Sequence, residues 1–364
     1  MILKSRPGAP NKTNADFRNC RLATLCAGIA AVSLFLAGFQ AGRPISAQTR
    51  SEQAARQASG PANAPVSRLF TDETGRRVEI PGDVKRVVSL APNLTEIVFA
   101  LGKGDQLAGD TDFCDYPPEA AQKPRVGGPV NPNLEQIVVL TPDLVLATKS
   151  INRRETVNAL ERLGLPVYVT DPHSVDEMVT SVEHIGNALH SEKSAEALMK
   201  DLRERLSGLD RRLAGAAPRR VLFVVWTDPL ISIGRDTFIS DALRHAGARS
   251  VMDTADEWPR VNLEEIIRLQ PEALVFASAH AGDTQHDIDA LRSRPGWRDL
   301  DALRHGNIVV ISDAINRPAP RIVDAIEQLA RALHSESFVS RNSAWAAPKQ
   351  IPTRNIEEAC ACAR

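Results

Sequence analysis

Along residues 68–172, the spacing of apolar residues switches several times between patterns typical of strands and patterns typical of helices. Leu69 to Ile80 alternates around Thr74-Gly75, which predicts a small β-hairpin. Beyond Arg86, short apolar runs typical of buried strands alternate with segments whose apolar residues recur at helical spacing. Asn93, with Glu96 three residues later, has the pattern of a capping box for the first helix. We therefore expect residues 68–172 to form an N-terminal α/β lobe with a parallel sheet.

One part of this pattern occurs twice. Residues 133–147 read NLEQIVVLTPDLVLA and residues 262–277 read NLEEIIRLQPEALVFA, with nine of fifteen aligned positions identical when Ala273 is skipped. In each copy an Asn opens a helical pattern, a Pro ends it, and an apolar run suits a buried strand. The alternative, a merely common helix–Pro–strand unit, leaves the repeated Asn-Leu-Glu unexplained. The repeat predicts an α/β fold of two similar lobes with parallel sheets and a cleft between them.

A long helical pattern lies between the two copies. Ser174 to Leu213 contains no Pro, and Ser174 with Glu177 forms a capping box. After a break near His190, an amphipathic pattern continues from Ala195 to Leu213. About 20 helical residues span roughly 30 Å, the scale of a small domain. We expect residues 173–217 to connect the lobes through one long interlobe helix that permits only modest closure, and residues 218–336 to form the C-terminal lobe.

The two ends of the chain read differently from the lobes. Residues 1–47 have a basic leader, an apolar stretch from Leu22 to Phe39 and Ile45-Ser46-Ala47, which resembles a signal-peptidase site. We expect cleavage after Ala47 and a periplasmic protein. The apolar stretch is also close to the roughly 18 residues that span a membrane, so an uncleaved N-terminal anchor stays open. Phe39 stands where a lipoprotein would need Cys. Residues 48–67 are predicted to be a flexible leader and residues 337–364 a disordered tail.

Charge and cysteine content narrow the partners. Residues 1–47 hold six basic residues and one acidic residue, so the remainder carries 38 basic and 44 acidic residues, a formal net charge of −6. This balance argues against a nucleic-acid partner. Of the five cysteines, Cys20 and Cys26 lie in the segment expected to be cleaved. Cys114 stands alone, and Cys360 and Cys362 lie in the last five residues, so no disulfide framework is indicated. A Cys-x-Cys tail can bind metal, but an irregular terminus is the simpler interpretation.

Aromatic residues gather in the loops where a ligand would bind. In open α/β sheets, ligands bind beyond the carboxyl ends of the strands. Only 4% of the residues are aromatic, yet several fall in segments expected at that edge. Such side chains suit the walls of a site for a large flat or apolar ligand, although each could instead close the end of a sheet. The candidate ligand-binding residues in these segments are Phe113, Tyr116, Pro129, Trp226, Trp258, Asn316 and Arg317.

Catalytic patterns are sparse. The chain has no Gly-x-Ser-x-Gly elbow, phosphate loop or His-Glu-x-x-His motif. Cys114 lies in a candidate loop without an obvious base, so it is not proposed as a nucleophile. His280 and His286 share a loop without a third ligand at recognisable spacing, and a solvated loop is favoured over a metal site. We expect a protein that is not an enzyme and holds no metal; an exported α/β enzyme is the alternative of another class.

Several motifs resemble a known family. They are RVVSLAPNLTE at 86–96, DYPPE at 115–119, RVGG from 125 through the first repeat, WPRVNLE at 258–264 and NRPAPR at 316–321. The chain is similar over residues 69–336 to the cobalamin-type substrate-binding proteins of ABC importers, within the group that binds ferric siderophores, haem and cobalamin. The resemblance implies two lobes bridged by a long helix, ligand capture in the cleft and docking on a permease dimer. It implies no intrinsic cofactor, and we expect a monomer.

The resemblance also assigns roles. Family members present one glutamate per lobe to arginines of the permease, and the matching positions are Glu135 and Glu264. Phe113 matches the aromatic position of the first site loop, and Trp258 the tryptophan before the second repeat helix. Gly128-Pro129 and Ala314 stand where cobalamin binders can carry tryptophan, and Trp226 can compensate from another loop. The expected ligand is cobalamin or a related corrinoid, with haem and ferric siderophores as alternatives.

Overall fold

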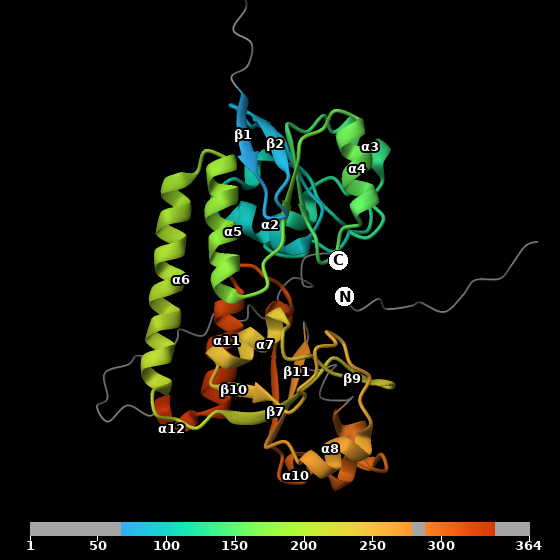
Figure 1. Cartoon of the computed structure of the whole chain (residues 1–364), viewed down its shortest axis with the longest axis vertical. Coiled ribbons are helices and arrows are strands. Elements are labelled where there is room, and N and C mark those ends of the chain that lie inside the picture. Colours follow the sequence, from blue (N-terminus) through green and yellow to red (C-terminus); the bar gives the residue numbers. More distant parts are fainter. Residues whose placement is uncertain (1–66, 279–287, 339–364) are drawn as a thin grey trace, which may run out of the picture. The chain divides into compact units, whose positions relative to one another are not determined.

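Two four-stranded parallel sheets with the same strand order form the centres of two lobes. The computed structural model describes residues 67–278 and 288–338 (Figure 1). The N-terminal sheet has the order β4-β3-β5-β6 and the C-terminal sheet the order β10-β7-β11-β12. In both, the first strand of the lobe lies between the second and the third. The two-lobed α/β fold predicted from the repeat is confirmed.

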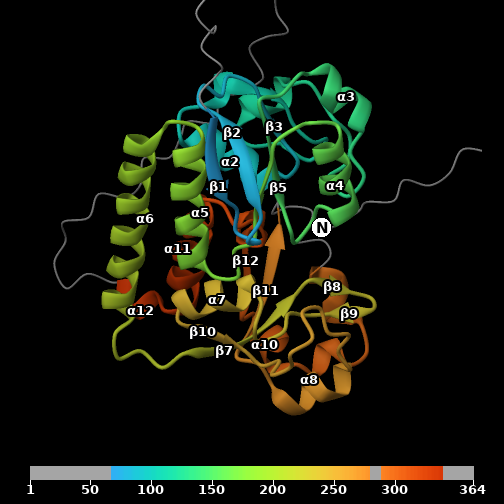
Figure 2. The same ribbon diagram turned by 45° about the horizontal axis from the view of Figure 1, so that its top comes forward.

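The N-terminal lobe contains a hairpin and a sheet with its helices. The hairpin pairs β1 (Ser67–Thr71) with β2 (Arg77–Pro81) in antiparallel fashion, as predicted. The remaining elements are β3 (Val87–Ser89), α2 (Pro92–Ala100), η1 (Gly104–Gln106), β4 (Leu107–Gly109), η2 (Pro118–Gln122), α3 (Leu134–Val139), β5 (Leu144–Thr148), α4 (Arg154–Arg162) and β6 (Val167–Thr170). A hydrogen bond of 3.1 Å from the Glu73 amide to the Val169 carbonyl ties the hairpin to β6. Figure 2 shows the two strands of this hairpin, β1 and β2.

The C-terminal lobe repeats this plan with additions. Its elements are β7 (Arg219–Val224), β8 (Trp226–Thr227), β9 (Leu230–Ile231), α7 (Phe238–His245), β10 (Ala248–Ser250), α8 (Leu263–Leu269), β11 (Ala273–Ser278), η3 (Trp297–Asp299), α10 (Asp301–Arg304), β12 (Ile308–Ser312), η4 (Asp313–Asn316), α11 (Ile322–Leu333) and α12 (Ser335–Phe338). The antiparallel pair β8–β9 has no counterpart in the N-terminal lobe.

The two repeat copies form the same kind of unit, a short helix capped by Asn that ends before a Pro. Asn133 caps α3 by accepting a hydrogen bond from the Gln136 amide, and Asn262 caps α8 by accepting one from the Glu264 amide. Each helix then ends just before its Pro, and the preceding residue is left-handed, with φ of 44° at Thr141 and 42° at Gln270. The short sequence signal therefore encodes the whole cap–helix–strand unit in both lobes.

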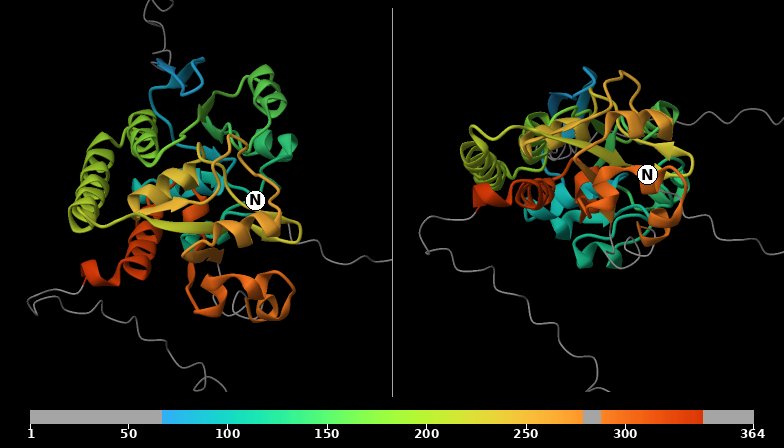
Figure 3. Two further views of the ribbon diagram at one scale, coloured as in Figure 1. Left: turned by 60° about the horizontal axis from the view of Figure 1, so that its bottom comes forward. Right: turned by 90° about the horizontal axis from the view of Figure 1, so that it is seen from below.

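Two helices connect the lobes. They are α5 (Val175–Ala188) and α6 (Glu192–Leu213), separated by a turn in which His190 has a φ of 52°. The Ser174 side chain caps α5 by accepting from the Glu177 amide, as the sequence predicted. α6 packs along α5 and reaches α11 and α12 of the C-terminal lobe, as both views of Figure 3 show. No helix among the described residues is long and apolar enough to cross a membrane.

The hydrophobic core is continuous across both lobes. Successive residues of a strand face opposite sides of the sheet, so Val87 and Phe223 enter a shared cluster while Val88 and Leu222 enter separate outer clusters. The shared cluster runs through buried residues of α5, α6, α7 and α11. This continuity ties the lobes together on the side of the connecting helices.

Local details differ from the sequence predictions at three places. Asn93 does not cap α2, because Pro92 occupies the first helical position and Ala91 is the N-cap, so the helix begins two residues earlier than predicted. Trp226 lies in the short hairpin β8–β9 rather than in an irregular loop. The ordered elements extend to Ser67, which pairs with Pro81, and to Phe338, which lies under the guanidinium of Arg331 at 5.7 Å.

Candidate functional site

The candidate site lies where the carboxyl ends of the two sheets lead into loops. In both sheets the chain moves outward from the first strand to the second and then crosses to the third, so the switch points fall between β3 and β5 and between β7 and β11. Ligands of open α/β sheets bind at such points. The segments that leave these edges carry most of the exposed aromatic side chains predicted from the sequence.

Phe113 is an exposed aromatic residue on the loop that follows β4 in the N-terminal lobe. Its side chain is 41% exposed. The loop that carries it is joined to the glycine loop before α3, because the Asp112 amide donates to the Gly127 carbonyl at 3.1 Å and Gly128 lies beside the Phe113 ring. Arg125 fixes the base of the loop by donating to the Asp110 carboxylate at 2.7 Å and to the carbonyls of Thr111 and Cys114.

Pro129 follows Gly128 and is buried rather than at the surface. Its carbonyl accepts a hydrogen bond of 2.8 Å from the side-chain Nδ2 of Asn152. The same side-chain Nδ2 of Asn152 donates to the Leu90 carbonyl at 2.9 Å, and the side-chain Oδ1 of Asn152 accepts from the backbone amide of Thr148 at 2.7 Å. Asn152 therefore joins the ends of β3 and β5 to the loop of Pro129.

Two tryptophans are exposed on neighbouring segments of the C-terminal lobe. Trp226 is 43% exposed and Trp258 is 48% exposed. Trp226 pairs with Ile231 across the β8–β9 hairpin, and Ile231 bridges to Arg260, two residues beyond Trp258. The two tryptophans therefore sit on neighbouring segments of one small platform. The indole N–H of Trp226 donates to the Asp228 carbonyl at 2.7 Å, which fixes the ring on its own hairpin.

Tyr116 and Arg317 lie instead at the boundary between the lobes. There, two arginines of the C-terminal lobe meet carboxylates of both lobes in what we call the interlobe ion-pair cluster: Glu96, Asp115, Asp313, Arg317 and Arg321. Glu96 on α2 is 4% exposed and accepts from Arg321 at 2.9 and 3.2 Å and from Arg317 at 3.1 Å. Arg317 also donates to Asp115 at 2.7 and 3.3 Å and to Asp313 at 3.2 Å.

The cluster shifts the acidity of its members. Burial by itself would raise the pKa of Asp115, but the hydrogen bonds and charge of Arg317 outweigh it and hold that pKa below its usual range. Burial also opposes the charged form of Arg317, yet Asp115, Asp313 and Glu96 together raise its pKa. The pairs between Arg317 and Asp115 therefore stay ionised across the neutral range.

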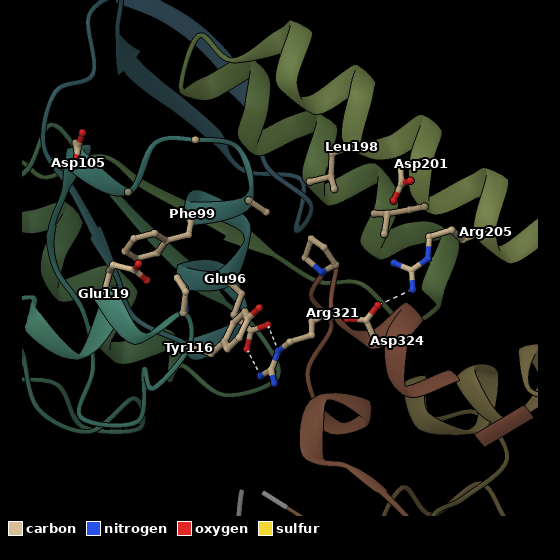
Figure 4. Close-up of a pocket in the computed structure, with 16 residues that line it drawn as sticks. Glu96, Phe99, Asp105, Tyr116, Glu119, Leu198, Asp201, Arg205, Arg321 and Asp324 are labelled. Carbon is tan, nitrogen blue, oxygen red and sulfur yellow. Dashed lines mark hydrogen bonds and ion pairs between the residues drawn. The ribbon is translucent and has the colours of Figure 1, made fainter. Parts of the chain in front are cut away.

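A hollow of about 560 Å³ lies next to the cluster (Figure 4). Glu96, Arg321 and Tyr116 form one side of it, and α6 forms another through Leu198 and Leu202. Tyr116 is 44% exposed, and the Arg321 guanidinium stacks on its ring at 4.0 Å. Asn316, at the end of η4, is exposed. Phe113, Trp226 and Trp258 do not line this hollow.

The described residues offer little for covalent or metal chemistry. Cys114 is buried, and burial raises the pKa of its thiol although hydrogen bonds from Thr111 and Thr95 oppose the shift. A nucleophilic thiol needs the opposite shift and an open approach. Among residues 67–278 and 288–338, no group of three or more His, Cys, Asp or Glu side chains could hold a metal ion. His280, His286, Cys360 and Cys362 lie outside the described residues.

The two repeated glutamates occupy equivalent places. Glu135 lies in the first turn of α3 and Glu264 in the first turn of α8, and both are exposed. No recorded ion pair of the described residues involves either carboxylate. α3 and α8 belong to different lobes and both lie away from α6 (Figures 1 and 2). The arrangement presents one exposed negative charge per lobe.

Sequence reasoning missed Glu96 and Arg321 as partners, and it missed the supports Arg125 and Asn152. A usable signal existed for the first pair. Glu96 ends one of the motifs on which the family resemblance rests, and Arg321 ends another from the opposite lobe. For Arg125 and Asn152 no local pattern distinguishes a loop support from a surface residue.

Comparisons with known proteins agree with this geometry. Residues 87–314 match the model of a family described as periplasmic binding protein. The chain is 30% identical over 275 residues to an uncharacterised ABC transporter substrate-binding lipoprotein of Bacillus subtilis, covering 73% of this chain and 85% of the relative.

Two solved structures resemble the fold. One is the periplasmic vitamin B12-binding protein of Vibrio cholerae, with a TM-score of 0.62 and 27% identity over 71% of this chain and 99% of that chain. The other is a periplasmic haem-binding protein from Roseiflexus sp. RS-1, with a TM-score of 0.63 and 27% identity over 70% of this chain and 100% of that chain.

Proposed function

The chain belongs to the periplasmic binding protein family, and we propose that it captures cobalamin or a related corrinoid between its lobes and delivers it to the membrane permease of an ABC importer. One observation carries this proposal. In a chain with 4% aromatic residues, Phe113, Trp226 and Trp258 are each more than 40% exposed on loops at the carboxyl edges of the two sheets. Exposed large aromatic side chains in a concave site suit a broad, flat ligand.

The charges around these aromatic residues support a corrinoid over an anionic ligand. Asp112, Asp228 and Glu257 are exposed next to Phe113, near Trp226 and next to Trp258. Arg260 is also exposed two residues beyond Trp258, and the excess of carboxylates over this cation disfavours the two propionates of haem and the carboxylates or catecholates of many siderophores. It tolerates the neutral amide side chains of a corrin. Arg317, the cation predicted to meet the ligand, is occupied by three carboxylates.

We separate the candidate ligand-binding residues into exposed ones, which are proposed to contact the ligand, and buried ones, which are proposed to support them. Phe113 forms one wall and Trp226 and Trp258 the other, with Asn316 as a polar contact from η4. Pro129 is buried, so we assign it to the support of the Phe113 wall. Glu135 and Glu264 are proposed to dock on the permease dimer, one per lobe.

Haem is the second candidate ligand, because of Tyr116. Haem iron is held by axial side chains such as His, Cys, Met or Tyr. Tyr116 is 44% exposed in the loop after β4. Its ring lines the hollow of Figure 4, where Arg321 stacks on it at 4.0 Å, and Phe113, Trp226 and Trp258 do not line that hollow. The separation of Tyr116 from the other exposed aromatic residues favours the corrinoid assignment over haem ligation.

The proposal describes transport without turnover. The buried Cys114 and its raised thiol pKa support binding rather than covalent catalysis. We further propose that the mature chain begins after Ala47, acts as a monomer in the periplasm and has no resident cofactor. Binding proteins of this kind need only a cleft and a docking surface, and the proposal assigns residues of the two lobes to each.

The absorption spectrum of the protein isolated from its source tests the ligand class. We expect the purified mature chain to carry a visible corrin spectrum that disappears after denaturation and dialysis. The bands of a corrin, a haem and a ferric siderophore differ in position and shape. A Soret band of haem, or the charge-transfer band of a ferric siderophore, would contradict the corrinoid assignment.

A further inference from the structure

Ligand binding does not explain why Glu96, Arg317 and Arg321 form ion pairs across the boundary between the lobes. We infer that the interlobe ion-pair cluster fixes the separation of the two lobes, so that Glu96, Arg317 and Arg321 are positioning residues for the cleft rather than ligand contacts. The effect on ligand affinity rests on the proposed function, whereas the effect on lobe separation does not.

Glu96 is the centre of the attachment. Its side chain is 3% exposed and receives guanidinium groups from residues 221 and 225 positions away in the chain. Arg321 binds it through two nitrogens, at 2.9 and 3.2 Å, and this geometry defines direction as well as distance. A buried carboxylate with two arginine partners is strongly held, because separation of the lobes would leave a desolvated charge unpaired.

The arginines have little capacity left for a ligand. A guanidinium has five N–H donors. Arg317 uses its Nη1 twice, on Glu96 and Asp115, and its Nη2 twice, on Asp115 and Asp313, so four of its five donors are engaged. Arg321 has Nε and Nη2 on Glu96 and its flat face on Tyr116 (Figure 4). Both side chains are built into the boundary.

The cluster complements the shared hydrophobic core. That core joins the lobes through α5, α6, α7 and α11. A second attachment is polar and links α2 of the N-terminal lobe to the η4–α11 segment of the C-terminal lobe. Two separate attachments restrict hinge motion more than one, because closure or opening about the first must break the second. The cluster therefore determines which lobe separation is populated.

Glu96→Gln tests this inference with little change in volume. Spin labels at Glu155→Cys on α4 and Arg268→Cys on α8 report the interlobe distance, since both positions are exposed on helices of different lobes. Cys360 and Cys362 are replaced by Ser, and Cys114 is buried. We expect the distance distribution, measured by pulsed electron resonance without ligand, to broaden and shift in Glu96→Gln. An unchanged distribution would overturn the inference.

Asp72→Asn is the matched control. Asp72 is also a fully buried carboxylate paired with an arginine, Arg76 at 2.5 Å, but both partners lie in the hairpin of the N-terminal lobe. We expect this variant to lower the melting temperature without altering the interlobe distance. If Glu96→Gln does not fold, Arg321→Lys keeps the charge and the fold but loses the two-nitrogen geometry, and the same broadening is expected.

Binding supplies the second readout. If Glu96→Gln reduces the population of the binding-competent separation to about a tenth, the Kd for cyanocobalamin should rise about tenfold, while Asp72→Asn leaves it unchanged. A broadened distribution with unchanged affinity would overturn the link between the cluster and the cleft. Failure of the wild-type chain to bind cyanocobalamin would reject the proposed ligand, and the distance measurement would still decide the role of the cluster.

Discussion

Trp258→Ala is expected to weaken corrinoid binding about thirtyfold while leaving the melting temperature of the protein without ligand nearly unchanged. Loss of a large aromatic contact in a binding site costs about 2 kcal/mol or more. Trp258 is 48% exposed, so its removal leaves no cavity in the core. Isothermal titration calorimetry and a thermal unfolding curve measure the two effects on one preparation.

Trp297→Ala provides the control for this prediction. Trp297 is 4% exposed and packs in the outer core of the same lobe. Its truncation should destabilise the fold by about 3 to 5 kcal/mol through the cavity it leaves. A melting temperature of Trp258→Ala that falls as far as that of Trp297→Ala would show that Trp258 closes the end of the sheet and does not form a ligand wall.

The double variant Glu135→Ala/Glu264→Ala is expected to abolish uptake and permease binding while ligand affinity stays within a few-fold. A carboxylate in the first turn of a helix stabilises it by only about 0.3–1 kcal/mol, so the fold should tolerate the change. Removing one member of a desolvated charge pair at an interface costs about 2–5 kcal/mol, so docking on the permease should be lost. Each single variant should be intermediate, and Arg at both positions should be worse through repulsion of a basic permease surface.

Glu155 and Glu192 supply the matched control for docking. They are exposed acids in the first turns of α4 and α6, outside the repeated motif. Uptake by the variant Glu155→Ala/Glu192→Ala should stay normal, because this variant loses two helix-dipole interactions but keeps Glu135 and Glu264. Normal uptake by the Glu135/Glu264 double variant would mean that the repeated Asn-Leu-Glu serves only the architecture of the two lobes.

The architecture could be read from the sequence because its signals are local. An Asn cap, a helical period and a Pro lie within fifteen residues of one another. Both copies form a helix capped by Asn, a residue of positive φ directly before the Pro, and a strand. The long pattern from Ser174 to Leu213 likewise contains its own cap and period. Such elements form from neighbours in the chain, so tertiary packing had little to overrule.

The interlobe cluster could not be read this way. Glu96 three residues after Asn93 has the pattern of a capping box, but Pro92 opens the helix and frees Glu96 for partners more than 220 positions away. Arg317 was assigned to the ligand because its loop follows the last strand, and the carboxylates that surround it come from both lobes. Contacts between lobes depend on how the sheets are placed, and no short pattern encodes that placement.

Titration of cyanocobalamin into the mature protein tests the central claim most directly. Calorimetry with haemin and a ferric siderophore alongside compares the three ligand classes on one sample. We predict saturable heat with cyanocobalamin at micromolar or tighter Kd, which corresponds to at least about 8 kcal/mol of binding free energy, and no saturable heat with the other two. Saturable heat with haemin or the siderophore, and none with cyanocobalamin, would contradict the corrinoid assignment.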